Sequence, residues 1–568
     1  MDSRVENHTK ARPNLAQSIH ARAPASIRRI MGLRPHSNAG TRNGGISILA
    51  KWTHPMTLWG AIRKVSPNDR WLQITLLAFM VLYYGVLLCD PGLHKPTPTL
   101  LFKADPQELT FNSMLAHLAH GQFDVDPNTV KDEGFLRNGH VYAYWGITCA
   151  LLRLPLLLFH RMDLNVTAWS CLIAVCLAGI MKVRAVLFLR RHCGPTPDSE
   201  WAFGLMLAYV ILGGAGVGYL KSSIYQEVIF WAIAFAAVFV YFAVRGLVSG
   251  EFTTVTLSWM AFAAGLALLT RASTGMGLYA AFALLLLVLL VKEFRARRTL
   301  FTLRILIPIA VLAAFLIVVG TVNYYRWGKP TTFVDLTLYL QNAEHPDRLL
   351  RMQLYGSFNL ARVPFGLGYY FLPLWALQGT DGRLLFENTQ TRLMDFVELP
   401  PSSFFLTDLL PIAFIVFLAM ALWARRQSLA RSLRTGWGFA QGKETQPPFR
   451  IFSPAQGLAL ATGLAVPCVL MLTFTSMSYR YRMEFYPEID LLAFLGLYAT
   501  VSDSAMLARF NRCRRWMLAA AMISIVLAFV VMILYKLSVF GPAREPLSKG
   551  IVHYYLQSAS HRLLHARQ

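Results

Sequence analysis

Residues 71–89 read WLQITLLAFMVLYYGVLLC, a run of 19 residues without a charged side chain. As an α-helix this run measures about 28 Å, which is enough to cross the hydrocarbon core of a bilayer. Further apolar runs of similar length follow at 164–181, 201–220, 228–244, 252–270, 272–291, 305–325, 409–424, 453–475, 485–502 and 516–535. The sequence therefore predicts an all-α polytopic membrane protein with about eleven transmembrane helices.

The composition of the 568-residue chain supports the same fold class. Hydrophobic residues make up 55% and charged residues only 15%, whereas soluble domains carry about 25% charged residues. The net charge of +24 would suggest nucleic acid as the partner of a soluble protein. Membrane proteins, however, keep Lys and Arg on the cytoplasmic side, so we expect a lipid bilayer and no nucleic acid.

The positive charges also predict the domain organisation. Residues 1–70 form a basic extension that we expect to be disordered and cytoplasmic, followed by the transmembrane domain 71–535 and a tail, 536–568. Loops with clustered Lys and Arg alternate with loops that carry few, which places the N-terminus inside. The clusters lie at 182–191, 292–298, 425–434 and 509–515.

One apolar segment, Val141–Phe159, would break this alternation if it crossed the membrane. It contains Arg153 and Pro155, and we expect it to form an amphipathic helix on the outer surface. Two long outer segments then remain, 90–163 and 326–408, and we expect them to build an outer cap.

The first of these outer segments is acidic in a basic protein. Between residues 90 and 140 there are seven Asp and Glu but only four Lys and Arg. Asp105-Pro106 is a typical helix start and Gly121 a typical helix end, so a short helix is predicted between them. Asp105 and Glu108 would lie in its first turn, near the membrane. Acids in a first turn also simply favour the helix dipole, and both interpretations stay open.

Several short motifs resemble GT-C-type glycosyltransferases, such as protein mannosyltransferases and the aminoarabinose transferase of lipid A. The first is Leu-x-x-Gly-x-x-Asp-x-Asp-Pro, which ends at Pro127. The others are Gly139-His-Val-Tyr-Ala-Tyr-Trp-Gly-Ile, Tyr225-Gln-Glu227, Thr270-Arg271-Ala-Ser, Asn323-Tyr-Tyr-Arg326-Trp-Gly328-Lys-Pro330 and Tyr479-Arg480-Tyr481-Arg482-Met-Glu484-Phe-Tyr-Pro487. The resemblance implies a multi-span enzyme that uses polyprenyl-phosphate-linked sugars. The family's pair of adjacent acids is absent, so the catalytic carboxylate is Asp105 or Glu108.

The chemistry that this resemblance implies needs few protein groups. A phosphate leaving group requires no general acid, so one carboxylate acting as base is sufficient for an inverting displacement. The leaving phosphate needs positive charge at the outer face. The candidates, each at the outer end of a predicted span or near one, are Arg271, Arg480, Arg482 and Lys221. Ordinary snorkelling of Lys and Arg is the alternative explanation for each.

Four further acids are secondary candidates. Glu227 at the mouth of a span suggests a function, or else a local ion pair with Lys221. Asp124, Asp126 and Glu484 are the remaining candidates. His117 and His120 with Asp124 could bind a divalent metal ion, but their spacing matches no common metal motif and solvated histidines are favoured.

The predicted function is sugar transfer from a polyprenyl-phosphate donor to a lipid, glycan or protein acceptor at the outer face. The membrane would be a bacterial cytoplasmic (inner) membrane, although an endoplasmic reticulum membrane also fits. A flippase for lipid-linked saccharides and an O-antigen polymerase or ligase are the alternatives. A transporter should carry ionisable residues near the middle of its spans, and the predicted span interiors are nearly free of charge.

Overall fold

The computed structural model describes residues 67–89, 106–296, 302–373, 393–397, 403–434 and 452–537. All of them belong to the larger of the two units of the chain, Ser66–Gln568. Asp105, nearly all of the predicted basic extension and nearly all of the C-terminal tail lie outside these ranges.

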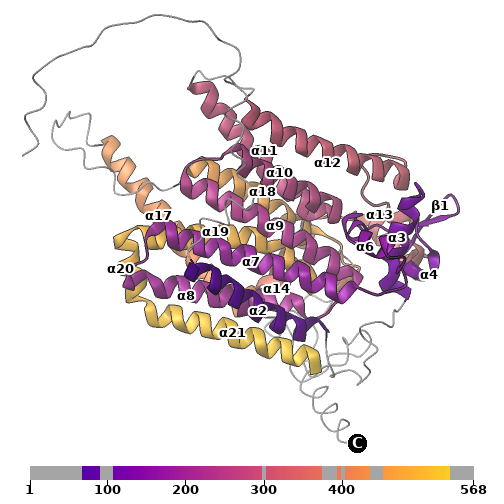
Figure 1. Cartoon of the computed structure of the whole chain (residues 1–568), viewed down its shortest axis with the longest axis horizontal. Coiled ribbons are helices and arrows are strands. Elements are labelled where there is room, and N and C mark those ends of the chain that lie inside the picture. The colour runs from indigo at the N-terminus through magenta and orange to yellow at the C-terminus, as the bar shows by residue number, and fades with distance from the viewer. Residues whose placement is uncertain are drawn as a thin grey trace, which may run out of the picture. The chain divides into compact units, whose positions relative to one another are not determined.

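Long helices dominate the described part of the chain, and each overlaps one of the predicted apolar runs (Figure 1). They are α2 (Pro67–Cys89), α7 (Thr167–Cys193), α8 (Pro197–Leu212), α9 (Ile224–Ser249), α10 (Thr254–Thr270), α11 (Ala272–Arg295), α12 (Leu303–Trp327), α17 (Leu409–Arg434), α18 (Pro454–Thr473), α19 (Tyr486–Ser502) and α21 (Arg514–Leu537). Nine helices in this part are long and apolar enough to cross a membrane. Of the two others, α10 has only 17 residues, and α19 continues through a 103° bend into α20 (Ser504–Arg512). The predicted fold class is confirmed.

The helices pack side by side through close contacts at small residues. The closest partners are α7 with α9, α9 with α10, α11 with α18, and α17 with α19. A Cβ atom added to Gly463 of α18 would lie 2.0 Å from the backbone nitrogen of Ala281 in α11. On Gly496 of α19 it would lie 2.1 Å from the carbonyl oxygen of Phe414 in α17. Glycine therefore lets these backbones approach closely, as in other membrane bundles.

Burial differs strongly between central and peripheral helices. In the most apolar 18-residue segment of α9, 89% is buried, compared with 22% in the corresponding segment of α12. Figure 1 shows α12 along the edge of the bundle. Side chains such as Leu316 and Ile317 on α12 are exposed, and in a membrane they would face lipid.

Shorter elements gather at one end of the bundle, where Figure 1 shows α3, α4, α6 and β1. They are η3 (Pro106–Leu109), α3 (Thr110–Ala119), α4 (Pro127–Val130), η4 (Lys131–Glu133), β1 (Phe135–Arg137), β2 (His140–Tyr142), α5 (Thr148–Leu151) and α6 (Leu154–Leu158). Strands β1 and β2 form an antiparallel hairpin with Phe135 opposite Tyr142. Its turn residues Asn138 and Gly139 both have positive φ, as a tight hairpin turn requires.

The segment Val141–Phe159 does not form the single amphipathic helix that the sequence predicts. It is divided among β2, an irregular stretch, α5 and α6, and it contains no helix of membrane-crossing length. Gly146 interrupts it where the backbone approaches the carbonyl group of Leu269 so closely that a Cβ atom would collide. Pro155 then lies in the first turn of the short helix α6, which begins at Leu154.

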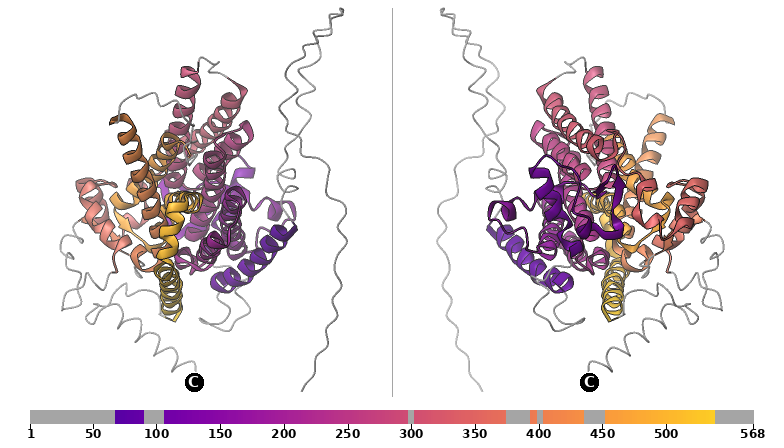
Figure 2. Two further views of the ribbon diagram at one scale, coloured as in Figure 1. Left: turned by 90° about the vertical axis from the view of Figure 1, so that its left-hand side faces the viewer. Right: turned by 90° about the vertical axis from the view of Figure 1, so that its right-hand side faces the viewer.

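A second set of short elements comprises η5 (Gly214–Tyr219), η6 (Leu336–Leu338), η7 (Leu340–Asn342), α13 (Pro346–Tyr355), η8 (Leu360–Arg362), α14 (Val363–Phe371), β3 (Phe396–Val397), α16 (Phe404–Thr407), β4 (Ser476–Met477) and η10 (Tyr479–Phe485). Two of these elements pack against the first set, η6 against β1 and η7 against η4. Strands β3 and β4 pair in parallel, and an isolated bridge joins Phe135 to Tyr339. The right view of Figure 2 faces the end of the bundle at which Figure 1 labels α13 and β1.

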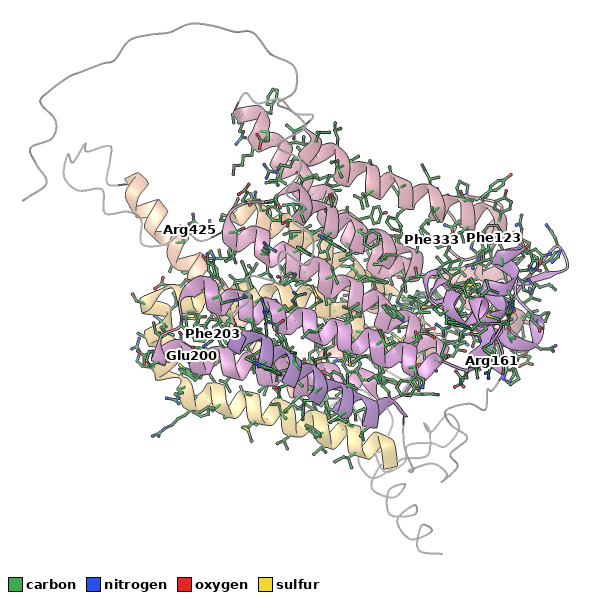
Figure 3. All side chains as sticks on the ribbon, in the orientation of Figure 1. Phe123, Arg161, Glu200, Phe203, Phe333 and Arg425 are labelled. Carbon is green, nitrogen blue, oxygen red and sulfur yellow. The ribbon has the colours of Figure 1, made fainter. Side chains whose placement is uncertain are left out.

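Two sets of residues mark the opposite ends of the bundle (Figure 3). Phe123, Arg161 and Phe333 lie at the end with the short elements, and Glu200 and Arg425 lie at the other end. These are the ends that the charge pattern predicts to face outward and inward, respectively.

The interior of the helices is not free of charge, and here the sequence prediction is wrong. Lys182, expected in an inner loop, lies within α7 and is buried. Its Nζ atom is 2.8 Å from Oδ2 of Asp490 in α19, which is also buried. The sequence does not reveal this ion pair, because the two side chains meet only when α7 packs against α19.

Candidate functional site

Two adjoining cavities lie among the short elements and the neighbouring helix ends. The apolar cavity, of about 450 Å³, is bounded by α10, α11, α12 and α18. The polar cavity, of about 460 Å³, is bounded by η4, α9, α13 and η10. Tyr144, Val334, Phe474 and Tyr481 line both. Each volume is in the range of small-molecule sites, and together they form one candidate site.

The apolar cavity combines aliphatic walls with two arginines. The aliphatic lining includes Leu268, Leu269, Val319, Val322 and Leu470. Arg271 and Arg326 approach from the start of α11 and the end of α12. Such a lining suits a ligand with an apolar chain and a negatively charged group.

The polar cavity contains two acids and two arginines. Glu133 lies at the end of η4 and Asp395 directly before β3. Arg348 comes from α13 and Arg480 from η10. Aromatic rings complete the lining, contributed by Phe135, Tyr144, Tyr225 and Tyr339. Carboxylates, arginines and aromatic faces are groups that bind sugars and phosphates.

Glu133 is held by neutral donors. The hydroxyl of Tyr339 donates to its Oε2 at 2.7 Å, and Nε2 of Gln341 donates to its Oε1 at 3.2 Å. Burial, and after it the nearby Glu133 carboxylate, raise the pKa of Tyr339, so this hydroxyl remains a donor. Among the described residues, no Lys, Arg or His lies within ion-pair distance of Glu133. Hydrogen bonds therefore orient the carboxylate of Glu133, but no ion pair with a described residue neutralises its negative charge.

The other acid of the polar cavity is neutralised. Nε of Arg348 lies 2.5 Å from Oδ2 of Asp395, and the guanidinium stacks 5.1 Å from the centre of the Tyr339 ring. Burial lowers the pKa of Arg348, but the Asp395 carboxylate and, after it, Tyr339 together outweigh burial, and the pKa rises. The ion pair between Arg348 and Asp395 therefore forms part of the cavity lining together with Glu133.

Arg480 and Arg271 meet at the junction of the two cavities. The Arg480 guanidinium lies 5.0 Å from the centre of the Tyr225 ring and 5.4 Å from that of Tyr481. Arg271 stacks on Tyr481 at 5.1 Å and forms an ion pair with Glu484. The structure thus brings together two of the four predicted phosphate ligands around one tyrosine.

Glu484 is a buried carboxylate that forms an ion pair with Arg271. It is buried and accepts hydrogen bonds from Ser273 at 2.8 Å and Thr274 at 2.5 Å as well as from Arg271. All three donors lie at the start of α11. As an acid with three donors already in place, Glu484 positions Arg271.

The other two predicted phosphate ligands line neither cavity. Arg482 is buried and forms an ion pair with Asp408, and its Nε donates to the Tyr486 hydroxyl at 3.2 Å. Lys221 lies between η5 and α9 and is exposed. Because Arg482 and Glu484 anchor η10 at two points, they hold Arg480 and Tyr481 of the same turn at the cavities.

Glu227 forms a buried ion pair, but not with Lys221. Its partner is Arg153, with 2.7 Å between Nη2 and Oε2, and Ser170 also donates to it. Arg153 and Glu227 are 1% and 0% exposed. The alternative of an ion pair with Lys221 is therefore wrong, since the turn between α5 and α6 carries Arg153 into the bundle.

The predicted catalytic acids have different positions. Asp105 lies outside the described residues. Glu108, in η3, accepts a hydrogen bond from Asn165, and it is not among the residues that line either cavity. Gln107, however, contacts the cavity residue Tyr225, with 3.3 Å from its Nε2 to the hydroxyl oxygen. The chain therefore passes the polar cavity two residues after Asp105.

Asp124 and Asp126 have local structural partners. Nδ1 of His117 and Nδ1 of His140 lie 2.9 and 2.8 Å from the two carboxylate oxygens of Asp124. Asp126 caps α4 by accepting from the backbone of Asn128 at 2.9 Å. In the described ranges, no three His, Cys, Asp or Glu side chains form a group that could hold a metal ion.

Sequence reasoning missed Glu133, Asp395 and Arg348. The acidic excess of residues 90–140 pointed to the right segment but not to Glu133 within it. No local pattern marks Asp395 or Arg348, because their pairing depends on how the second outer segment folds back onto the first.

Comparisons with known proteins give a weak structural likeness. No protein-family model and no curated protein sequence matches the chain. It is similar to the archaeal oligosaccharyltransferase AglB from Archaeoglobus fulgidus, in complex with an inhibitory peptide and a dolichol-phosphate, at 12% identity and a TM-score of 0.45. It is also similar to the Archaeoglobus fulgidus oligosaccharyltransferase tethered to an acceptor peptide, at 13% identity and a TM-score of 0.43. Each likeness covers 84% of this chain but only 57% and 56% of those chains, and at this level it carries no argument about function.

Proposed function

We propose that the protein is a membrane glycosyltransferase that transfers a sugar from a polyprenyl-phosphate donor to an acceptor at the outer face. One observation carries the proposal: the apolar cavity with its arginines meets the polar cavity with its carboxylate at Tyr144 and Tyr481. A polyprenyl-phosphate sugar presents an apolar chain, a phosphate and a sugar in that order. The two cavities offer complementary surfaces in the same order.

The reaction is an inverting displacement at the anomeric carbon. The acceptor oxygen forms the new bond to this carbon while the bond from carbon to the phosphate oxygen breaks, and the electron pair leaves with the phosphate. The acceptor proton passes to a carboxylate. Because phosphate is a stable leaving group, the base and a positive environment for the phosphate are the two catalytic needs.

Arg480 and Arg271 are the proposed phosphate ligands. Both stack on Tyr481 at the junction of the cavities, where the phosphate of the donor would lie. Charge-assisted bonds from arginine to phosphate are short and frequently bidentate. Arg482, bound to Asp408, acts instead as a positioning residue for η10.

The proposed base is either Glu133, which lines the polar cavity, or Asp105, which lies outside the described residues. Asp105 precedes the Gln107 contact with Tyr225 by two residues. Glu133 lines the cavity and is oriented by Tyr339 and Gln341. Glu108 is the weaker candidate, since its carboxylate is bound to Asn165.

The membrane in this proposal is a bacterial cytoplasmic membrane, with the N-terminus inside and the cavities outside. The alternation of basic loops supports this orientation. The acceptor would be a lipid, glycan or protein that reaches the polar cavity from the outer aqueous side.

A flippase for lipid-linked saccharides is the second candidate function. The buried pair Lys182–Asp490 favours it, because ionisable residues inside a bundle are typical of transport proteins. Unlike the transferase, a flippase forms and breaks no covalent bond.

Reconstitution with a radiolabelled polyprenyl-phosphate sugar separates the two candidates. Transfer predicts that free polyprenyl phosphate accumulates together with labelled acceptor, and that both depend on the protein. Movement of intact donor between leaflets without any polyprenyl phosphate release would instead establish the flippase. A polymerase would extend a saccharide chain on its lipid carrier, and a ligase would move such a chain from its carrier to an acceptor; the same extraction detects both products.

A further inference from the structure

Arg326 is a buried cation without a carboxylate partner. Its side chain is 3% exposed, at the end of α12. In the part of the chain that the structure describes, no carboxylate lies within 4.0 Å of its guanidinium. Burying an arginine without a counter-charge is costly, so such residues are usually paired or bind an anion.

The hydrogen bonds of Arg326 are incomplete. Nη1 donates to the carbonyl oxygen of Trp145 at 2.7 Å, and Nη2 approaches the sulfur of Met114 at 3.3 Å. Nε is buried and has no hydrogen-bond partner. A thioether is a weak acceptor, so two of the three nitrogens lack a strong acceptor.

The apolar cavity lies beside this arginine. Arg271, the other arginine that lines the cavity, is already neutralised by Glu484. Arg326 therefore supplies the positive charge that no described carboxylate balances. Asn323, one turn earlier on α12, also lines the cavity and is a second polar group on the same wall.

We propose that the apolar cavity binds the phosphate group of a lipid next to Arg326, with the lipid chain against the aliphatic lining. This inference deepens the proposed function, on which it rests, by adding Arg326 as a ligand of the donor phosphate. Two sources share this chemistry, a polyprenyl phosphate and an anionic phospholipid of the bilayer. The aliphatic walls at Val319, Val322 and Leu470 accommodate an unbranched or an isoprenoid chain.

Binding of farnesyl phosphate to the purified full chain in detergent tests the proposal without any catalysis. Arg326→Gln should weaken binding by about 10- to 100-fold, the usual worth of a bond between two charged groups. Arg304→Gln is the matched control, because Arg304 lies at the opposite end of α12, where it donates to the backbone of Phe252. This control should leave binding unchanged.

Two more variants distinguish a lost binding site from a misfolded protein. Arg326→Lys keeps the charge and should lose less affinity than Arg326→Gln. Val322→Trp fills the cavity but retains Arg326, and it should abolish binding at an unchanged melting temperature. Equal binding by wild type, Arg326→Gln and Val322→Trp would overturn the proposal.

Competition identifies the source of the phosphate. Dioleoyl phosphatidylglycerol should displace farnesyl phosphate only at a large excess. Equal competition would contradict the assignment to the donor, because the cavity would then be a site for bilayer lipid. If wild type binds farnesyl phosphate but releases none from a glycosylated donor, the transferase function fails while the Arg326 site stands.

Discussion

The guanidinium of Arg153 donates to both carboxylate oxygens of Glu227, at a point where both side chains are fully buried. Ser170 donates to the same carboxylate and accepts from Trp231 at 2.9 Å. This pair fixes the short elements before α6 to the helices α7 and α9. It thereby sets the position of Tyr144 and Trp145, which line the apolar cavity.

Removal of one partner of this pair should be costly. Arg153→Met leaves the buried Glu227 without its cation, and we expect a loss of about 3–5 kcal/mol in the free energy of unfolding. The double variant Arg153→Met with Glu227→Met should recover a large part of this loss. Thermal unfolding in detergent measures both, and a double variant less stable than the single one would contradict the interpretation.

The tight contact between α11 and α18 predicts a steric effect at Gly463. Gly463→Ala places a methyl group 2.0 Å from the backbone nitrogen of Ala281, and such overpacking typically costs about 1–3 kcal/mol. Gly204→Ala is the control, since nothing lies within 4 Å of its added Cβ. The melting temperature should fall for Gly463→Ala alone, and an equal response of both variants would refute the close contact.

Acid should weaken the local structure around Asp124. Partial burial raises the pKa of Asp124, but hydrogen bonds to His117 and His140 outweigh it and the pKa is lowered. A lowered carboxyl pKa gives stability that is present above the unfolded pKa, about 4, and is lost as the pH falls through the folded pKa. The difference in melting temperature between wild type and Asp124→Asn should therefore shrink as the pH falls from about 5 to 3. A difference that grows in this window would contradict the sign.

The orientation in the membrane is testable at the two ends of the bundle. A cysteine in place of Arg161 should react with an impermeant thiol reagent from outside, whereas one in place of Glu200 should not. Both side chains are accessible, with exposed fractions of 55% and 41%. Cys513, which is also exposed, must first be replaced by serine. Labelling of position 200 but not 161 from outside would reverse the topology.

The helices could be predicted from the sequence, but the contacts between their side chains could not. Each apolar run predicted to cross the membrane overlaps a long helix, because hydrophobic length is a local property of the chain. The pairs Lys182–Asp490 and Arg153–Glu227 join residues that are distant in sequence, so no local pattern reveals them. For the same reason the sequence indicated Arg271 and Arg480 at the site but not Arg326 as an uncompensated charge.

The site acids show the same limit. The excess of acids in 90–140 was visible, yet the choice of Glu133 depends on the packing of Tyr339 and Gln341 from the second outer segment. Val141–Phe159 was misjudged as one helix because its apolar composition conceals the irregular stretch around Gly146. The amino-acid composition identified the acidic segment 90–140, but only tertiary contacts identified Glu133 within it.

In the proposed mechanism, a carboxylate at the polar cavity removes the proton of the acceptor while arginines hold the donor phosphate. The most direct measurement compares turnover and donor binding in Asp105→Asn, Glu133→Gln and Arg480→Ala. The variant that removes the base should bind donor as wild type does and lose about 10²–10⁴-fold in turnover, whereas Arg480→Ala should lose donor affinity as well. Wild-type turnover in both carboxylate variants, with donor binding unaffected by Arg480→Ala, would contradict the account.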